Sequence, residues 1–128
     1  MEIQELKAFE APNIFSLREP IIKMNIELDK LKTIPTKEIE MVYDKIAELF
    51  PAMKGHELST EQKEKNIVHL TQKLCLEILR ELDYDVKYGE VKYAKDDRYS
   101  IIFECPHTVI GKACGTFAIN ILNDLIIG

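Results

Sequence analysis

A long amphipathic segment, EQKEKNIVHLTQKLCLEILREL, runs from Glu61 to Leu82 and sets how the rest of the chain must pack. Its apolar residues recur near the period of an α-helix, so one side of the helix is expected to face a core. That side carries Ile67, Leu74, Ile78 and Leu82, with Val68, Cys75 and Leu79 beside them. At about 100° of rotation per residue, the opposite side gathers His69, Gln72, Lys73 and Arg80. The sequence therefore predicts that any chemistry in this helix lies on its polar side.

Two strands and another helix are expected before this segment. Residues 3–9 read as a strand, and residues 14–19 read as a connector with two or three apolar anchors. A second strand is clearer, because apolar and polar residues alternate through Ile22, Met24, Ile26 and Leu28. Thr36 is expected to cap a helix with the stripe Ile39, Val42, Tyr43, Ile46, Leu49 and Phe50. Ser59 and Gln62 then have the spacing of a capping box for the helix that follows.

A β-hairpin and a last helix are expected after it. Residues 86–93 and 99–104 read as strands on either side of the charged turn 95–98. Thr108 is predicted to cap a helix in which Gly111 and Gly115 permit close packing. Its apolar stripe is Ile110, Cys114, Phe117, Ala118, Ile121 and Leu125. The order β-β-α-α-β-β-α predicts a two-layer α+β sandwich, with about four mainly antiparallel strands and three helices on one face.

Length and charge limit the classes of function. A chain of 128 residues fits a single domain, spanning residues 1–128. The net charge is −5 and the basic residues are scattered, which argues against nucleic acid as a partner. We find no signal peptide and no apolar run approaching a membrane span, so the chain is expected to be cytoplasmic, without a membrane partner. Three cysteines in no disulfide-like framework agree with a reducing compartment.

Two parts of the chain resemble the N-terminal domain of cyanophycin synthetase. APNIFSLR, residues 11–18, and PIIKMNIEL, residues 20–28, are similar to its opening, where a Gly-Pro-Asn-aromatic segment with a nearby arginine precedes an alternating strand. YSIIFE, residues 99–104, and the glycine- and alanine-rich helix after it resemble its end. The resemblance covers nearly the whole chain and implies a half-unit of the pitrilysin-like zinc peptidases.

The resemblance also implies a parent enzyme that makes an Asp-Arg polymer with an ATP-grasp domain and a Mur-ligase-like domain. Neither domain is recognised in these 128 residues, and no Gly-x-x-x-x-Gly-Lys-Ser/Thr phosphate loop is present. We therefore do not expect this polypeptide alone to carry out ATP-driven ligation. The tasks implied for the N-terminal domain are holding the polymer and, in members with a zinc motif, cutting it to make primers.

That zinc motif is His-x-x-Glu-His on a helix, where two imidazoles bind Zn²⁺ and the carboxylate acts on the metal-bound water. The aligned residues are His69, Gln72 and Lys73. Gln72 stands where the general base would be, and glutamine cannot take a proton. Lys73 stands where the second ligand would be, and an ammonium group does not coordinate zinc. The sequence therefore predicts a vestigial motif, with no catalytic residue, no bound metal and no cofactor.

Other residues remain candidates for binding or for different chemistry. The ligand-binding candidates are His69, Lys73, Glu77, Arg80 and Arg18. Against this, a lone histidine on a polar helix face is usually solvated or hydrogen-bonded, and Glu77 can equally be an exposed charge partner of Arg80 or Lys73. Cys105, His107 and Cys114 match no standard metal spacing, so packing cysteines are favoured. Cys105 with His107 as a nucleophile pair lacks a recognisable oxyanion hole.

Three functions are compatible with these observations. The first is a non-catalytic domain that binds a peptide or an Asp-Arg polymer through charge-assisted hydrogen bonds. The alternative is a structural module that contacts other domains of a ligase or a second copy of itself. The third is a residual metal-dependent peptide hydrolase using His69. We favour the first because two of the three peptidase groups are missing.

Overall fold

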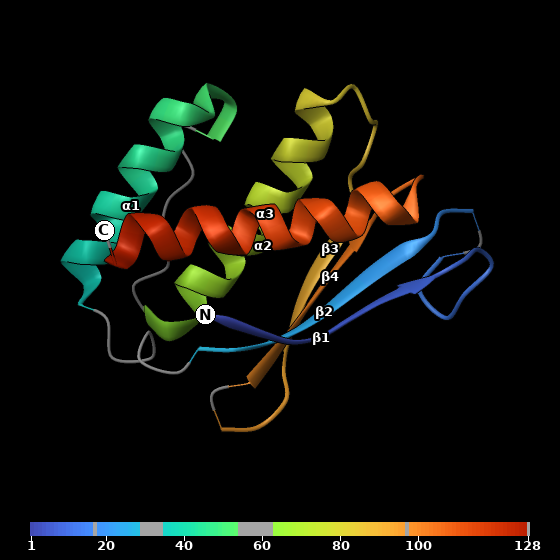
Figure 1. The fold of residues 1–128 in the computed structure, drawn as a ribbon, viewed down its shortest axis with the longest axis horizontal. Coiled ribbons are helices and arrows are strands. Elements are labelled where there is room, and N and C mark those ends of the chain that lie inside the picture. The colour runs from blue at the N-terminus through green and yellow to red at the C-terminus, as the bar shows by residue number, and fades with distance from the viewer. Residues whose placement is uncertain (17, 29–34, 54–62, 97, 128) are drawn as a thin grey trace.

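The computed structural model describes residues 1–16, 18–28, 35–53, 63–96 and 98–127. Within these residues, four antiparallel strands form one sheet and three α-helices accompany it (Figure 1). The elements are β1 (Glu2–Phe9), β2 (Ile21–Glu27), α1 (Thr36–Leu49), the short 3-10 helix η2 (Pro51–Met53), α2 (Lys63–Glu81), β3 (Gly89–Tyr93), β4 (Arg98–Glu104) and α3 (Thr108–Ile127). The predicted α+β class and the order β-β-α-α-β-β-α are confirmed.

The strand order in the sheet is β1-β2-β4-β3, so the two central strands come from distant parts of the chain. Met24 lies opposite Ile101, and Ile26 lies opposite Tyr99. Successive side chains of a strand point to opposite faces. One face of β2 and β4 is therefore a continuous apolar surface, consisting of Ile22, Met24, Ile26, Tyr99, Ile101 and Phe103, all of them buried.

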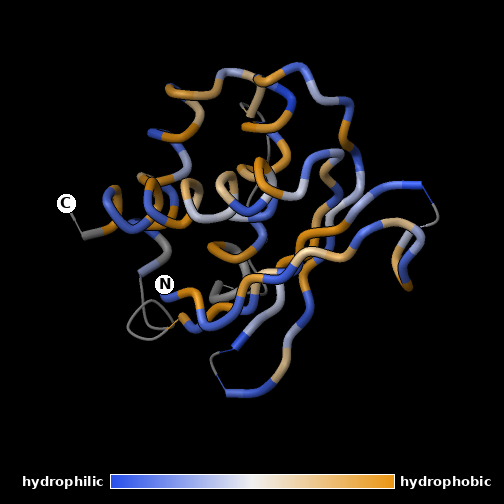
Figure 2. Tube along the Cα trace, turned by 45° about the vertical axis from the view of Figure 1, so that its right-hand side comes forward, coloured by the Kyte–Doolittle hydropathy of each residue, from blue (hydrophilic) through white to orange (hydrophobic). Residues whose placement is uncertain are grey.

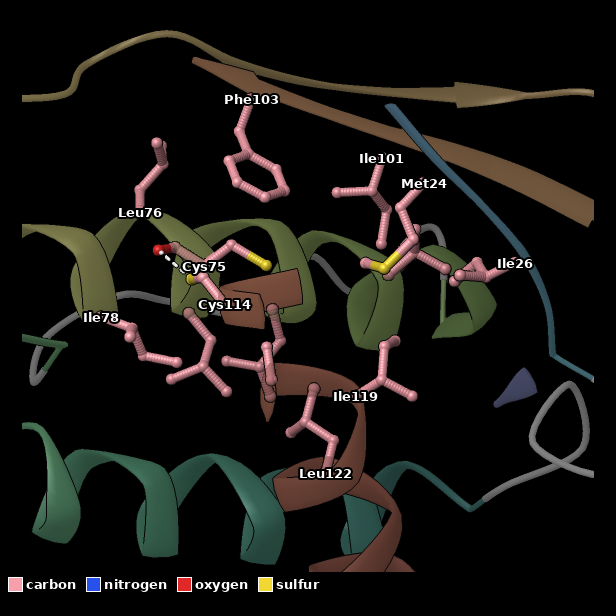
Figure 3. Close-up of a cluster of buried hydrophobic side chains, with 14 of the residues drawn as sticks. Met24, Ile26, Cys75, Leu76, Ile78, Ile101, Phe103, Cys114, Ile119 and Leu122 are labelled. Atoms are coloured by element: carbon pink, nitrogen blue, oxygen red, sulfur yellow. Dashed lines mark hydrogen bonds between the residues drawn. The ribbon is translucent and has the colours of Figure 1, made fainter. Parts of the chain in front are cut away.

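Two helices cover this apolar face. Along α2 and α3 the trace alternates between hydrophobic and hydrophilic residues, as expected of helices with one side in a core (Figure 2). Phe103 and Met24 point from the strands toward α2, and Ile119 and Leu122 of α3 lie on the far side of the same cluster (Figure 3). The main contacts of α1 are with α2, α3 and η2. The helices thus occupy one side of the sheet, with α1 added to the outside of the helical layer.

The position of α2 explains where the predicted helix faces are wrong. Because α2 packs on β3 and β4 on one side and on α3 and α1 on others, it is buried around most of its circumference. Its Thr71, Gln72 and Glu77 therefore belong to the interior. Gln72, predicted on the polar side, is only 9% exposed, whereas Leu82, predicted on the apolar side, is 55% exposed. A helix in the middle of a fold buries its polar residues too, provided they find partners.

Some predicted helix caps and apolar contacts also differ from the structure. The cap residue of α1 is Pro35, and no side chain caps the helix, so the predicted cap by Thr36 is wrong. Ser59 and Gln62 lie outside the described residues. Ile14 is 92% exposed and is no anchor, whereas the Phe15 ring lies 6.3 Å from that of Phe9.

One helix has the composition of a membrane span. Thr108–Ile126 in α3 has a mean hydropathy of 1.3 and, among the described residues, is long and apolar enough to cross a membrane. The expectation that no run approaches a span is wrong in this respect. Core helices of soluble proteins pass the same test. In this fold α3 packs against β1, β2, α1 and α2.

Candidate functional site

Four of the five predicted ligand-binding residues lie on one row of α2. His69, Lys73, Glu77 and Arg80 are separated by four, four and three positions, which places them along the same side of a helix. His69 and Arg80 are exposed and Lys73 is half-buried. Glu77 is only 6% exposed, so the expectation of an exposed charge partner at this position is wrong.

Glu77 and Arg80 contact each other and the segment after the helix. Arg80 Nη1 lies 3.8 Å from Glu77 Oε2, and Arg80 Nε donates a hydrogen bond of 3.1 Å to the carbonyl oxygen of Val86. A buried carboxylate is costly unless a cation or hydrogen-bond donors face it. Arg80 therefore compensates the charge of Glu77 and fixes the segment between α2 and β3 to the end of the helix.

Gln72 lies beneath the first residue of β3. A β-carbon built on Gly89 would stand 1.9 Å from Gln72 Nε2 and 3.0 Å from Leu76 Cδ1. The side chain of Gln72 thus occupies the space that the missing side chain of Gly89 leaves open. The sequence analysis missed this contact, although a glycine inside the predicted strand 86–93 was a sign of close approach.

The residues at the three motif positions do not fit a zinc ion. His69 supplies one imidazole, but the amide of Gln72 packs under the strand and Lys73 carries an ammonium group. Among the described residues, no group of three histidine, cysteine, aspartate or glutamate side chains could hold a metal ion. The donor set therefore lacks both the general base and the second ligand of the peptidase motif.

A strand edge runs beside the α2 row. β3 pairs with β4 and with no other described strand, and α2 contacts β3. Tyr88 O accepts a hydrogen bond from Glu104 N (3.1 Å), and Ala94 N donates one to Arg98 O (3.0 Å). In an antiparallel ladder, residues bonded to the partner strand alternate with residues whose backbone groups point away. The outward-pointing backbone groups of β3 are therefore those of Gly89, Val91 and Tyr93.

Arg18 does not join the α2 row. It is exposed in the segment between β1 and β2, where its backbone N–H donates to Ser16 Oγ (3.2 Å). In the same segment, the Phe15 ring lies 5.5 Å from Lys92 Nζ. Lys92 is paired with Ser100 and projects from the face opposite the helices. The segment of Arg18 thus covers the other side of the sheet.

The three cysteines are buried thiols. Cys105 Sγ donates to the carbonyl oxygen of His107 (3.1 Å), and Cys114 Sγ donates to that of Cys75 (3.2 Å; Figure 3). Hydrogen bonding with Cys114, followed by burial, raises the pKa of Cys75, and burial raises the pKa of Cys105. A raised pKa disfavours the nucleophilic thiolate. This environment is that of packing cysteines and opposes a Cys105–His107 nucleophile pair.

Comparisons with known proteins identify the domain. Residues 23–127 match the family model described as "Cyanophycin synthase-like N-terminal domain". The chain is 21% identical over 137 residues to cyanophycin synthetase of Geminocystis herdmanii, covering 98% of this chain and 16% of that protein. Identities to the cyanophycin synthetases of Trichormus variabilis and Crocosphaera subtropica are 23% and 24%, each again over 98% of this chain. The chain spans 15% or 16% of the length of these relatives. It belongs to the family of cyanophycin synthase-like N-terminal domains.

Proposed function

We propose that this domain is a non-catalytic binding module that holds a peptide or an Asp-Arg polymer along the outer row of α2 and the edge of β3. The observation that carries the proposal is the adjacency of a polar helix row and an unpaired strand edge. An extended chain can add to such an edge through backbone hydrogen bonds, while nearby side chains select its sequence.

Lys73 is the residue best suited to meet a carboxylate of the ligand. It is half-buried, which limits its hydration, and it forms no ion pair with any residue that the structure describes. Glu77 could meet a guanidinium group only in exchange for Arg80, because that arginine already faces its carboxylate. We therefore place the main attraction at Lys73 and a competitive contact at Glu77.

The absence of hydrolysis in this proposal follows from the chemistry of the motif positions. A peptide lying across His69, Gln72 and Lys73 would meet one imidazole, one amide and one ammonium group. None of these, in this arrangement, generates a hydroxide nucleophile at neutral pH. The domain would therefore retain the peptide without cutting it.

Titration calorimetry with soluble Asp-Arg oligomers at low salt tests the proposal. We expect saturable heat from the wild-type domain, and affinity at least about fivefold weaker for Lys73→Gln, because a charge-assisted contact is lost. Lys112→Gln is the matched control, since Lys112 is an exposed lysine on α3. If the wild-type domain gives no heat, an Asp-Arg oligomer is not its ligand. If Lys73→Gln and Lys112→Gln weaken the affinity equally, the oligomer does not bind along α2.

A second candidate, an assembly module, is favoured by the exposed apolar side chains of α3. Val109 is 80% exposed and Phe117 is 53% exposed. Both side chains belong to α3, eight positions apart, and a contact surface requires that exposed apolar side chains such as these be covered together by a partner. In sedimentation at increasing concentration, we expect the domain to self-associate and the Phe117→Ser variant to self-associate less. A wild-type domain that stays monomeric at every concentration would contradict self-assembly.

A further inference from the structure

The face of the sheet opposite the helices carries a row of polar side chains. Met24 and Ile26 point into the core, so Lys23 and Asn25 point the other way. On the neighbouring central strand, Ser100 lies opposite Asn25, and Arg98 lies opposite Glu27. These residues come from β2 and β4, which are adjacent in the sheet but far apart in sequence.

A hollow of about 380 Å³ lies over this row. Its walls include Lys23, Asn25 and Ser100, together with Lys95 and Arg98 from the turn between β3 and β4 and the start of β4. Figure 2 shows hydrophilic residues at that turn, well away from the helices. The hollow is therefore polar and lies on the opposite side of the sheet from the α2 row.

The charges of this face are not balanced within the hollow. Two carboxylates lie nearby. Glu5 pairs with Lys7 at 2.5 Å, whereas Glu27 is not part of the lining and accepts a hydrogen bond of 3.0 Å from the neutral amide of Gln4. In contrast, Lys23, Lys95 and Arg98 have no ion pair with any residue that the structure describes, although Arg98 is the cross-strand neighbour of Glu27. Among the charged residues that line the hollow, three are cations and one, Glu5, is a carboxylate already paired with Lys7, so positive charge is in excess in the lining.

A neutral donor is already oriented on the floor of the hollow. Ser100 Oγ donates a hydrogen bond of 2.7 Å to Asn25 Oδ1. With its oxygen engaged, the amide of Asn25 has its NH₂ group left to donate, and no described residue accepts from it. A fixed amide donor among cations is an arrangement that suits an oxyanion.

We propose that this hollow binds a small oxyanion with two or more negative charges, such as a phosphate group or a dicarboxylate. Lys23, Lys95 and Arg98 supply the positive charge, and Asn25, held by Ser100, donates a directed hydrogen bond to an oxygen of the ligand. A dianion fits better than a monoanion because the three cations outnumber the single carboxylate of the lining. This inference is independent of the function proposed for α2.

NMR titration of the ¹⁵N-labelled domain tests the inference with inorganic phosphate, succinate and sodium chloride at matched ionic strength. We expect saturable shifts of the Asn25 and Ser100 amides with phosphate, with succinate or with both, and none with chloride. Saturation by phosphate alone identifies a phosphate site, and saturation by succinate alone identifies a carboxylate site. Linear shifts that chloride reproduces would overturn the inference.

Variants locate the site. Lys23→Gln and Arg98→Gln should each weaken the binding at least about fivefold, and Ser100→Ala should weaken it less, because it only frees the amide of Asn25 to rotate. Lys45→Gln, an exposed position on α1, is the charge-matched control and should leave the binding unchanged. Thermal unfolding checks that each variant is folded. Equal affinity of Lys23→Gln and the wild-type domain would contradict the assignment.

Discussion

The side-chain amide of Gln72 fills the space in which a β-carbon of Gly89 would stand: the distance from that position to Gln72 Nε2 is 1.9 Å. This contact joins the middle of α2 to the first residue of the edge strand. It accounts for the burial of a glutamine that the sequence analysis expected on the polar side of the helix. The same contact brings the polar row of α2 next to the edge of β3, on which the proposed binding function depends.

Gly89→Ala is expected to lower the free energy of unfolding by about 1–3 kcal/mol, as overpacking of a core does. The added methyl group must displace the buried Gln72 side chain. In a Gln72→Ala background the same change should cost clearly less, because the nearest atom has gone. Urea unfolding of the four proteins measures this coupling. Strictly additive effects would show that the two residues do not compete for the same space.

Two glycines of α3 should respond differently to the same substitution. A β-carbon at Gly111 would lie 2.6 Å from Ile22 Cγ1 and 3.0 Å from Cys105 Cβ, both in fully buried residues. At Gly115 the nearest atom is Met24 Sδ at 3.2 Å, on a flexible side chain. Gly111→Ala should therefore destabilise by about 1–3 kcal/mol. Gly115→Ala should be close to neutral, because a gain of about 1 kcal/mol in helix propensity offsets the contact. Similar losses of stability in both variants would refute this difference.

Arg80→Ala should lower the free energy of unfolding by about 1–2 kcal/mol. It leaves the buried carboxylate of Glu77 without its cation and removes the hydrogen bond to Val86 O. The estimate is moderate because the arginine side chain is 47% exposed. Arg80→Lys keeps the charge but loses the Nε donor. Its free energy of unfolding should therefore lie between those of the wild-type protein and the Arg80→Ala variant. Chemical denaturation of the three proteins decides the order, and an Arg80→Ala variant as stable as the wild type would contradict it.

Stability should fall with rising pH above the ordinary pKa of the thiols, 9.0. Hydrogen bonding with Cys114 and burial raise the pKa of Cys75 in the folded state. The folded protein therefore keeps a proton that the unfolded chain releases, so the stabilisation is complete below pH 9 and is lost as pH rises further. By pH 9.5 the loss for this one thiol is on the order of 1 kcal/mol or less. Cys75→Ala should show a correspondingly shallower decline in urea unfolding between pH 7 and 9.5; identical declines would contradict the prediction.

Local patterns in the sequence were sufficient for the class and order of the elements. The alternation around Met24, the period of the 61–82 segment and the charged turn near Asp96 each depend on neighbours in sequence. Burial in the middle of the fold depends on packing at long range, which a single period does not report. That is why Gln72 was placed on the wrong side of α2 and why Leu82 was expected in the core.

The candidate sites could also be predicted only as far as local sequence patterns determine them. The row of His69 and Lys73 follows from helix geometry alone, so the sequence was sufficient to place it. The burial of Glu77 and its pairing with Arg80 depend on how α2 sits against its neighbours. The polar hollow between Lys23 and Arg98 exists only because β2 pairs with β4, and the strand order could not be deduced from the sequence.

Amide hydrogen exchange on β3, with and without soluble Asp-Arg oligomers, tests the binding function most directly. An added strand would bond the outward N–H groups of Gly89, Val91 and Tyr93, whereas those of Glu90 and Lys92 already face β4. We predict that exchange slows at least about tenfold at the three odd-numbered positions and changes little at the two even-numbered ones. Unchanged exchange at Gly89, Val91 and Tyr93 under saturating oligomer would contradict it.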